Sequence, residues 1–195
     1  MMADHYEIEK IAGVDEVGRG ALFGPVVAGA VILSPKAELA LAKLGVTDSK
    51  RLKATQRTAL VEPIHRWADA YAIASASVHE IDRINILWAS LLAMKRAVTQ
   101  LTPSPTLCLI DGNKPIPNLD IPQQTIIKGD QNSVAIAAAS ILAKVWRDTL
   151  IVRLDKRYPG YDLASNKGYG SPRHRAAIGK LGRSRQHRKS FRVGQ

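Results

Sequence analysis

The chain has 195 residues, of which 46% are hydrophobic and 23% charged, so it fits one folded domain and excludes disordered and low-complexity classes. A single cysteine, Cys108, excludes a disulfide framework and a cysteine-based zinc site, and its apolar neighbours predict a small buried side chain. The longest apolar runs, 24–33 and 134–143, reach about half of the roughly 20 residues that a membrane span needs. Because residues 1–10 also carry three acids, we expect no membrane span and no signal peptide, and the single cysteine indicates a reducing, cytoplasmic compartment.

The formal net charge of +11 is concentrated at one end of the chain. Residues 1–143 hold 14 basic and 14 acidic residues, whereas residues 144–195 hold 14 basic and 3 acidic. Clustered Lys and Arg displace counterions from a phosphate backbone, so the sequence favours a nucleic-acid partner. A membrane surface is disfavoured, because glycines and tyrosines at 158–161 and 168–170 interrupt the basic residues, which line no apolar helical face.

The first half of the chain alternates apolar runs with helical patterns. Two runs rich in Val and Ile predict strands joined through Gly18-Arg19-Gly20, a sequence that permits a tight turn. Pro63 is expected to kink or restart the helix in which it lies. In chain order we expect strands over 11–17 and 25–33, helices over 37–44 and 54–69, a strand over 70–78, and helices over 79–85 and 86–101.

The second half follows the same alternation. Small residues from Ala135 to Ser140 open the strongest predicted helix and would allow it to lie close to a sheet. Trp67, Trp88 and Trp146 fall at helical positions and are expected in the core or at its edge. We expect a strand over 106–110, a loop over 113–122, a strand over 125–127, and helices over 133–158 and from 172 to about 182. Together the elements predict one α/β domain.

Three of the predicted strand ends carry an acid beside a glycine. These acids are the pair Asp15 and Glu16, then Asp111, then Asp130. Any one of them alone is better explained as a turn residue, but four acids that converge would repel one another unless a hard cation lies among them, which implies Mg²⁺ or Mn²⁺. Neighbouring side chains of a strand face opposite ways, so Asp15 and Glu16 can share one site only if the strand ends at Asp15. The sequence contains no motif of a serine nucleophile, a zinc site or a P-loop.

Seven short segments in one order resemble the type 2 ribonucleases H, specifically bacterial-type ribonuclease HII. The resemblance covers about residues 10–193. The matching segments are 12–20 (AGVDEVGRG), 48–50 (DSK), 110–113 (IDGN), 128–130 (KGD), the helix 136–148 (IAAASILAKVWRD), 166–170 (NKGYG) and 187–191 (HRKSF).

The resemblance implies a ribonuclease H-like fold, with a central mixed β-sheet flanked by helices, in a single catalytic domain over 1–195. Within it, 159–195 would be a basic, helical, substrate-binding C-terminal extension. The implied reaction is metal-dependent hydrolysis of the RNA strand of RNA/DNA hybrids and incision on the 5′ side of ribonucleotides embedded in duplex DNA. The two-metal-ion mechanism leaves 5′-phosphate and 3′-hydroxyl ends.

The resemblance also assigns roles to residues. It makes Asp15, Glu16, Asp111 and Asp130 the catalytic and metal-binding carboxylates. The backbone of Gly18, Arg19 and Gly20 would sense the ribose 2′-hydroxyl, and Tyr169 would contact the nucleotide at the RNA-to-DNA junction.

The remaining cations are open to two interpretations. Lys50, Lys144 and Arg147 are candidate phosphate contacts or ordinary solvated residues, and Arg19 either contacts phosphate or pairs with the acids. Asp148 is explained by an ion pair with Lys144, four residues earlier on the same helix. Two other functions are alternative hypotheses to a ribonuclease: a non-catalytic nucleic-acid-binding protein, and a metal-dependent phosphatase or nuclease of different specificity.

Overall fold

The structure is a computed structural model that describes residues 10–193. The expectation that the chain carries no signal peptide concerns residues 1–10, of which 1–9 lie outside the described part. Within that part, no helix has both the length and the apolar character needed to cross a membrane.

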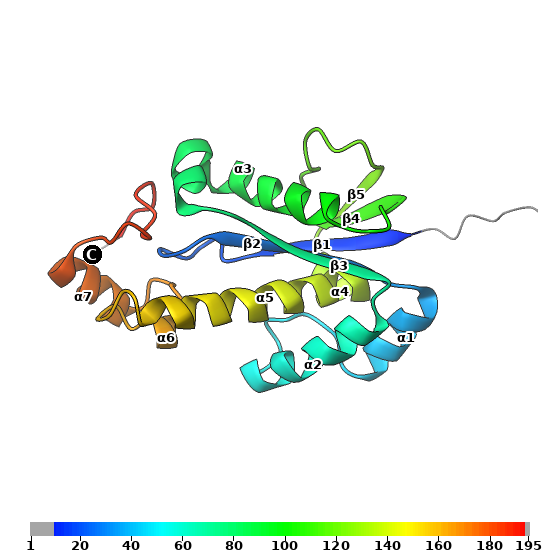
Figure 1. Ribbon diagram of the computed structural model, residues 1–195, viewed down its shortest axis with the longest axis horizontal. Coiled ribbons are helices and arrows are strands. Elements are labelled where there is room, and N and C mark those ends of the chain that lie inside the picture. Colours follow the sequence, from blue (N-terminus) through cyan, green and yellow to red (C-terminus); the bar gives the residue numbers. More distant parts are fainter. Residues whose placement is uncertain (1–9, 194–195) are drawn as a thin grey trace, which may run out of the picture.

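The centre of the molecule is a mixed sheet with the strand order β3-β2-β1-β4-β5 (Figure 1). Strand β1 pairs antiparallel with β2 and parallel with β4, so it lies in the middle of the sheet. Strand β3 adds antiparallel to β2, and β5 adds parallel to β4. The strands are β1 Ile11–Val17, β2 Val26–Ile32, β3 Ala70–Ala76, β4 Leu107–Asp111 and β5 Gln123–Ile126. The predicted mixed sheet is therefore confirmed.

Helices cover both faces of this sheet (Figure 1). Helix α3 lies on one face and α5 on the other, and α1 and α2 pack outside α5. Every residue of β2 is buried, because this strand lies between α3 and α5. The helices are α1 Pro35–Lys43, α2 Ala54–Trp67, α3 Val78–Thr99, α4 Gly129–Asn132, α5 Val134–Asp155, α6 Leu163–Asn166 and α7 Pro172–Leu181.

Helix α5 touches the sheet at backbone distance, as its small residues predicted. A Cβ at Gly13 in β1 would lie 2.2 Å from the carbonyl carbon of Ala135, and one at Gly29 in β2 would lie 2.4 Å from the carbonyl oxygen of Ala139. The glycines of two strands thus face the alanines of one helix. This close approach fixes the position of α5 relative to β1.

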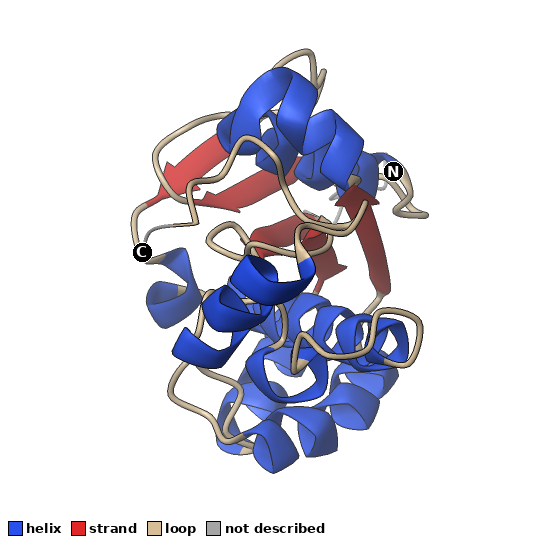
Figure 2. Cartoon of the chain, turned by 90° about the vertical axis from the view of Figure 1, so that its left-hand side faces the viewer, coloured by secondary structure: helices blue, strands red, loops and turns tan. Residues whose placement is uncertain are grey.

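The C-terminal region gathers at the far end of β1. Residues 163–193, with α6 and α7, lie at the end where the segment 18–24 joins β1 to β2 (Figures 1 and 2). An apolar cluster joins this C-terminal region to the segment 18–24, and an isolated β-bridge pairs Phe23 with His187. The cluster contains Leu22, Phe23, Ile151, Tyr161, Leu163 and Ile178.

Several local predictions were wrong. Pro63 does not restart the helix in which it lies, because α2 continues through it. The short helix α6 was not expected. Trp88 and Trp146 are 49% and 42% exposed instead of lying in the core, whereas Trp67 packs against a core cluster as expected. Periodicity marks a helix but not which of its faces meets the sheet, which is why the tryptophans were misplaced. Cys108 is fully buried, as predicted.

The contact between α5 and the sheet gives a stability prediction. Gly13→Ala places a methyl group against backbone atoms that cannot turn aside, so we expect it to lower the free energy of unfolding by at least about 1–3 kcal/mol. Gly179→Ala is the matched control, because its Cβ would have no neighbour within 4 Å and it lies in α7. It should raise stability by up to about 1 kcal/mol. Urea unfolding measures both, and equal stabilities would contradict the close approach.

Candidate functional site

The candidate site lies where β1 and β4 part. Their parallel pairing ends at Val14 and Ile110, so Asp15 and Asp111 are the next residues of the two strands. A cavity of about 530 Å³ opens there. Its walls include Asp15, Glu16, Val17, Gly18, Arg19, Gly20, Ser49, Lys50, Arg57, Asp111, Ser140, Lys144 and Tyr169.

Asp15 and Glu16 both line this cavity, but not for the reason expected. Strand β1 does not end at Asp15, because its pairing with β2 continues to Val17. The cavity reaches both side chains since β4 no longer flanks β1 beyond Val14. The prediction that the two acids can share a site only if β1 ends at Asp15 was therefore wrong, although both acids do line one cavity.

Burial, together with neighbouring acids, raises the pKa of two carboxyls of the cavity, Asp15 and Glu16. Burial raises the pKa of Asp15 well above its usual range, and the charges of Glu16 and Asp111 raise it further against a hydrogen bond from Ser140. Burial also raises the pKa of Glu16, although Arg19, 3.1 Å away, opposes the shift. A cation among these carboxylates would remove both the repulsion and part of the burial cost.

Asp130 lies beside this group and not in the wall of the cavity. It sits in the short helix α4, is 3% exposed, and accepts a hydrogen bond from Lys50 Nζ at 3.1 Å. Burial lowers the pKa of Lys50, but Asp130 outweighs it and the net shift is upward. Asp111 connects the two regions, because its Oδ1 accepts the N–H of Gly129 at 2.7 Å. The structure thus places three of the four predicted acids in the wall of one cavity. The fourth, Asp130, is bonded to Lys50, which also lines that cavity.

Carboxylates are ligands that hard divalent cations prefer, although here their oxygens form hydrogen bonds or ion pairs with protein groups. Within residues 10–193, no three Asp, Glu, His or Cys side chains stand close enough together to hold a metal ion as they are placed. A second observation favours a polar occupant. The Ser90 hydroxyl is buried without a hydrogen-bond partner in the described part, and it lines a cleft of about 60 Å³ together with Glu16 and Asp111. All-oxygen donors beside an unpaired hydroxyl fit hydrated Mg²⁺ or Mn²⁺.

The turn at residues 18–20 is shaped by a buried arginine. Gly18 has φ +88°, and a Cβ there would lie 2.1 Å from Nε of Arg147, whereas a Cβ at Gly20 would meet nothing within 4 Å. Arg147 is fully buried and donates to the carbonyls of Phe23, Pro25 and Lys167 at 2.9–3.1 Å. Its prediction as a phosphate contact is therefore wrong: it supports the turn from inside.

Arg188 is a second supporting arginine that the sequence analysis did not single out. It is 1% exposed and donates to the carbonyls of Gly18 and Arg19, both at 2.7 Å, and of Gly24 at 3.0 Å. Burial, and next the charge of Arg147, lower the pKa of this guanidinium to about 9. The only sequence signal for it was its place in the motif 187–191.

Tyr169 faces the cavity between cations. Its ring centroid lies 5.3 Å from Nζ of Lys144 and 5.5 Å from Cζ of Arg147, within cation–π distance. Lys144 also pairs with Asp148 at 2.8 Å, as predicted, and Asp148 lies outside the cavity. Arg57 and Ser140 complete the walls and were not predicted.

Two buried histidines hold the backbone of Tyr169. His174 Nδ1 lies 2.8 Å from the Tyr169 carbonyl, which can only accept, so this nitrogen carries the proton. His187 Nδ1 lies 2.9 Å from the N–H of Ser184, which can only donate, so the His187 proton is on Nε2. His187 Nε2 then donates to His174 Nε2 across 3.1 Å. The chain of bonds is complete only when both rings are neutral.

Comparisons with known proteins agree on one family. A family model described as ribonuclease HII matches residues 12–193. The curated ribonuclease HII of Acaryochloris marina is 64% identical over 94% of this chain and 92% of its own length. Ribonuclease H2 of Pyrococcus horikoshii is 27% identical with a TM-score of 0.79, over 94% of each chain. Bst-RNase HIII in complex with Mn²⁺ also reaches a TM-score of 0.79, over 97% of this chain and 69% of its own, at 20% identity, which shows a common fold.

The histidine pair predicts a loss of stability in acid. Burial, and then His174, lower the pKa of His187 from 6.5 to about 4, and burial lowers that of His174. The unfolded chain therefore binds protons at a higher pH than the folded chain, so the free energy of unfolding should fall as the pH drops from about 6.5 towards 4. Unfolding midpoints across this range measure the slope. His187→Phe should flatten it, and an unchanged slope in that variant would contradict the assignment.

Proposed function

Because this chain belongs to the ribonuclease HII family and is a ribonuclease H, an endoribonuclease that acts on nucleic acid, we propose that it cleaves two related substrates. They are the RNA strand of RNA/DNA hybrids and duplex DNA with embedded ribonucleotides, which is cut on the 5′ side of the ribonucleotide. The products carry 5′-phosphate and 3′-hydroxyl ends. One observation supports this proposal above the others: the cavity that holds Asp15, Glu16 and Asp111 is also lined by the 18–20 turn and Tyr169.

In this proposal Asp15, Glu16, Asp111 and Asp130 hold Mg²⁺ or Mn²⁺. Two such ions supply charge stabilisation at the attacking and leaving oxygens of a phosphodiester. Lys50 and Arg19 already neutralise Asp130 and Glu16, each at 3.1 Å. Exchange of these protein cations for metal would release both side chains, which are exposed enough to turn towards a phosphate. Lys144, on the wall of the same cavity, is a third phosphate contact.

Selectivity for ribose is assigned to the 18–20 turn. Arg188 donates to the carbonyls of Gly18 and Arg19 from behind. Among the described residues, the N–H groups of 18–20 have no backbone acceptor outside the strands, so they remain for a ligand. An N–H donor suits the 2′-hydroxyl oxygen, the group that distinguishes RNA from DNA. Gly20, with no atom within 4 Å of a Cβ position, leaves room for close approach.

We assign substrate binding beyond the cavity to 159–195, as a basic extension of one catalytic domain. Tyr169, which lines the cavity, belongs to this segment. The exposed cations of the segment, such as Arg173 and Lys180, remain available to phosphates. Arg188 serves the turn instead.

The proposal is tested with a panel of four substrates in the presence of Mg²⁺ or Mn²⁺. The panel contains an RNA/DNA hybrid, a DNA duplex with one ribonucleotide, an all-DNA duplex and a small phosphate ester. We expect cleavage of the first two only, and none after chelation of the metal. Cleavage of plain DNA or of the ester would favour a different nuclease or a phosphatase, and binding without any cleavage would favour a non-catalytic protein.

Removal of one carboxylate charge should separate catalysis from binding. We expect Asp111→Asn and Asp130→Asn each to abolish cleavage and to leave hybrid affinity nearly unchanged, because each weakens the metal site and removes no basic contact. Asp148→Asn is the matched control: this acid lies outside the cavity and pairs only with Lys144, so most activity should remain. An equal loss in the control would contradict the assignment of the four acids.

Loss of the Tyr169 ring should affect the two substrates unequally. A single ribonucleotide offers one junction, whereas a hybrid offers many alternative registers, so Tyr169→Ala should slow cleavage of the single-ribonucleotide duplex more. Stacking worth about 1–3 kcal/mol corresponds to about five- to 150-fold in rate. Cleavage rates on both substrates measure the effect, and equal losses would make Tyr169 a general structural residue.

A further inference from the structure

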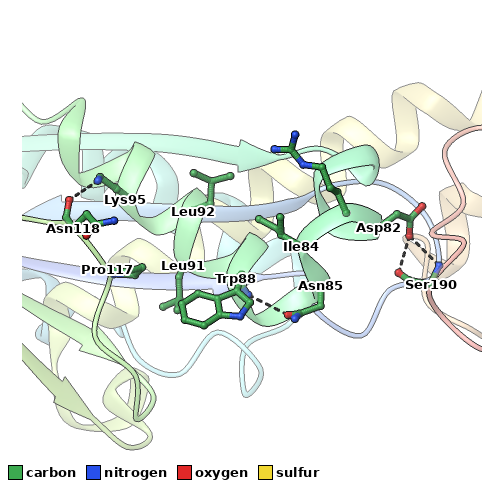
Figure 3. A pocket seen from close by; sticks show the side chains of 11 residues that line it. Asp82, Ile84, Asn85, Trp88, Leu91, Leu92, Lys95, Pro117, Asn118 and Ser190 are labelled. Carbon is green, nitrogen blue, oxygen red and sulfur yellow. Dashed lines mark hydrogen bonds between the residues drawn. The ribbon is translucent and has the colours of Figure 1, made fainter.

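A cavity of about 750 Å³ lies on α3, apart from the predicted site residues. Figure 3 shows its wall, in which side chains of α3 face the loop at Pro117 and Asn118. Trp88 is the largest side chain of this wall and is 49% exposed. A half-exposed indole in a cavity of this size offers a flat apolar surface to a ligand.

The cavity exists because α3 is broken at Asn85. This residue has φ +64°, and its Oδ1 accepts the N–H groups of Leu87 at 2.9 Å and Trp88 at 3.3 Å (Figure 3). The side chain thus caps the second part of the helix, which restarts in a new direction. Trp88 belongs to the first turn after this break and is held at its backbone.

The charged groups of the wall favour an anion. Asp82, its acid, accepts hydrogen bonds from the N–H groups of Lys189 and Ser190 and from the Ser190 hydroxyl, at 2.6–3.0 Å. Arg83 is exposed, and Lys95 donates to the neutral carbonyl of Asn118. Among residues 10–193, neither of these cations has a carboxylate within ion-pair distance.

This cavity and the candidate catalytic cavity both adjoin one small cleft. The cleft of about 60 Å³ that contains Ser90 shares Leu91 with the wall at Trp88 and shares Glu16, Arg19 and Asp111 with the catalytic cavity. Lys114 lines the same cleft and is exposed. Lys114 in the cleft and Trp88 in the neighbouring cavity thus lie on the side of the acids towards α3.

We propose that the cavity at Trp88 binds an unpaired nucleotide of a single-stranded flank of the substrate, with its base against the Trp88 indole and its phosphates near Arg83 and Lys95. Base stacking on an aromatic ring tolerates any sequence, and the cations recognise the backbone, so the site extends the footprint without adding sequence preference. The inference rests on the proposed function, because it takes the acids as the point of cleavage.

The test measures affinity against the length of the flank. DNA duplexes with one ribonucleotide carry a single-stranded flank that is lengthened one nucleotide at a time, first on one side and then on the other, and their Kd is measured by anisotropy in EDTA, where metal-dependent cleavage does not occur. We expect a step in affinity when one flank reaches the cavity. Trp88→Ala should remove that step, which is about five- to 150-fold for a stacked base. Trp146→Ala, which removes a similarly exposed indole from α5, should keep it.

Two further readouts complete the experiment. Substrate binding should quench tryptophan emission in the wild-type protein and in Trp146→Phe, and much less in Trp88→Phe. Arg83→Gln should flatten the salt dependence of Kd by about one unit per lost phosphate contact. A Kd for Trp88→Ala within twofold of wild type at every flank length, in a variant whose melting temperature is unchanged, would overturn the proposal and favour a protein occupant. Failure of the proposed function would appear separately, as absence of cleavage by the wild-type protein in Mg²⁺.

Discussion

Two buried guanidinium groups hold the segment that joins β1 to β2. Arg147 approaches from α5 and Arg188 from the C-terminal region, and together they donate to five carbonyls between residues 18 and 25. Neither arginine pairs with a carboxylate among the described residues, so backbone carbonyls compensate their charge, aided by the rings of Tyr169 and Phe191. Such cations are costly to bury, and removal of either would leave several buried carbonyls without donors. The 18–20 turn beside the acids depends on this arrangement.

The same arrangement explains how the C-terminal region joins the catalytic half. Arg188 ties it to the turn, and Phe23 contributes to the apolar cluster shared with Tyr161 and Ile178. The His174–His187 pair then connects that region to the carbonyl of Tyr169. Basic residues near the C-terminus therefore fall into two groups. Some are buried supports of the 18–20 turn, and others are exposed, and we propose these exposed cations as phosphate contacts.

The charges of the acids at the candidate site are compensated differently from those of the two buried arginines. Each acid near the cavity is bonded to a protein group: Glu16 to Arg19, Asp130 to Lys50, and Asp111 to the N–H of Gly129. Burial, and then the charges of neighbouring acids, raise the pKa of Asp15 and Glu16. A bound metal ion would therefore stabilise the ionised form of these carboxylates. Among these partners, the exposed side chains of Lys50 and Arg19 are the ones that can move away from the acids.

The sequence by itself determined the strands, most helices, the acids that lie near the ends of β1 and β4 and, through its motifs, the family, because these depend on local periodicity and on residue types at short spacing. It did not predict that Asp130 lies in a short helix, α4. The tertiary structure alone decided which cations are supports and which are free. Arg147 looked like a phosphate contact and Arg188 was not singled out, yet both are buried against carbonyls more than 120 residues away in the chain. It also decided that Trp88 is exposed at the break in α3. Burial depends on what the rest of the fold places against a side chain, and a sequence window contains no such information.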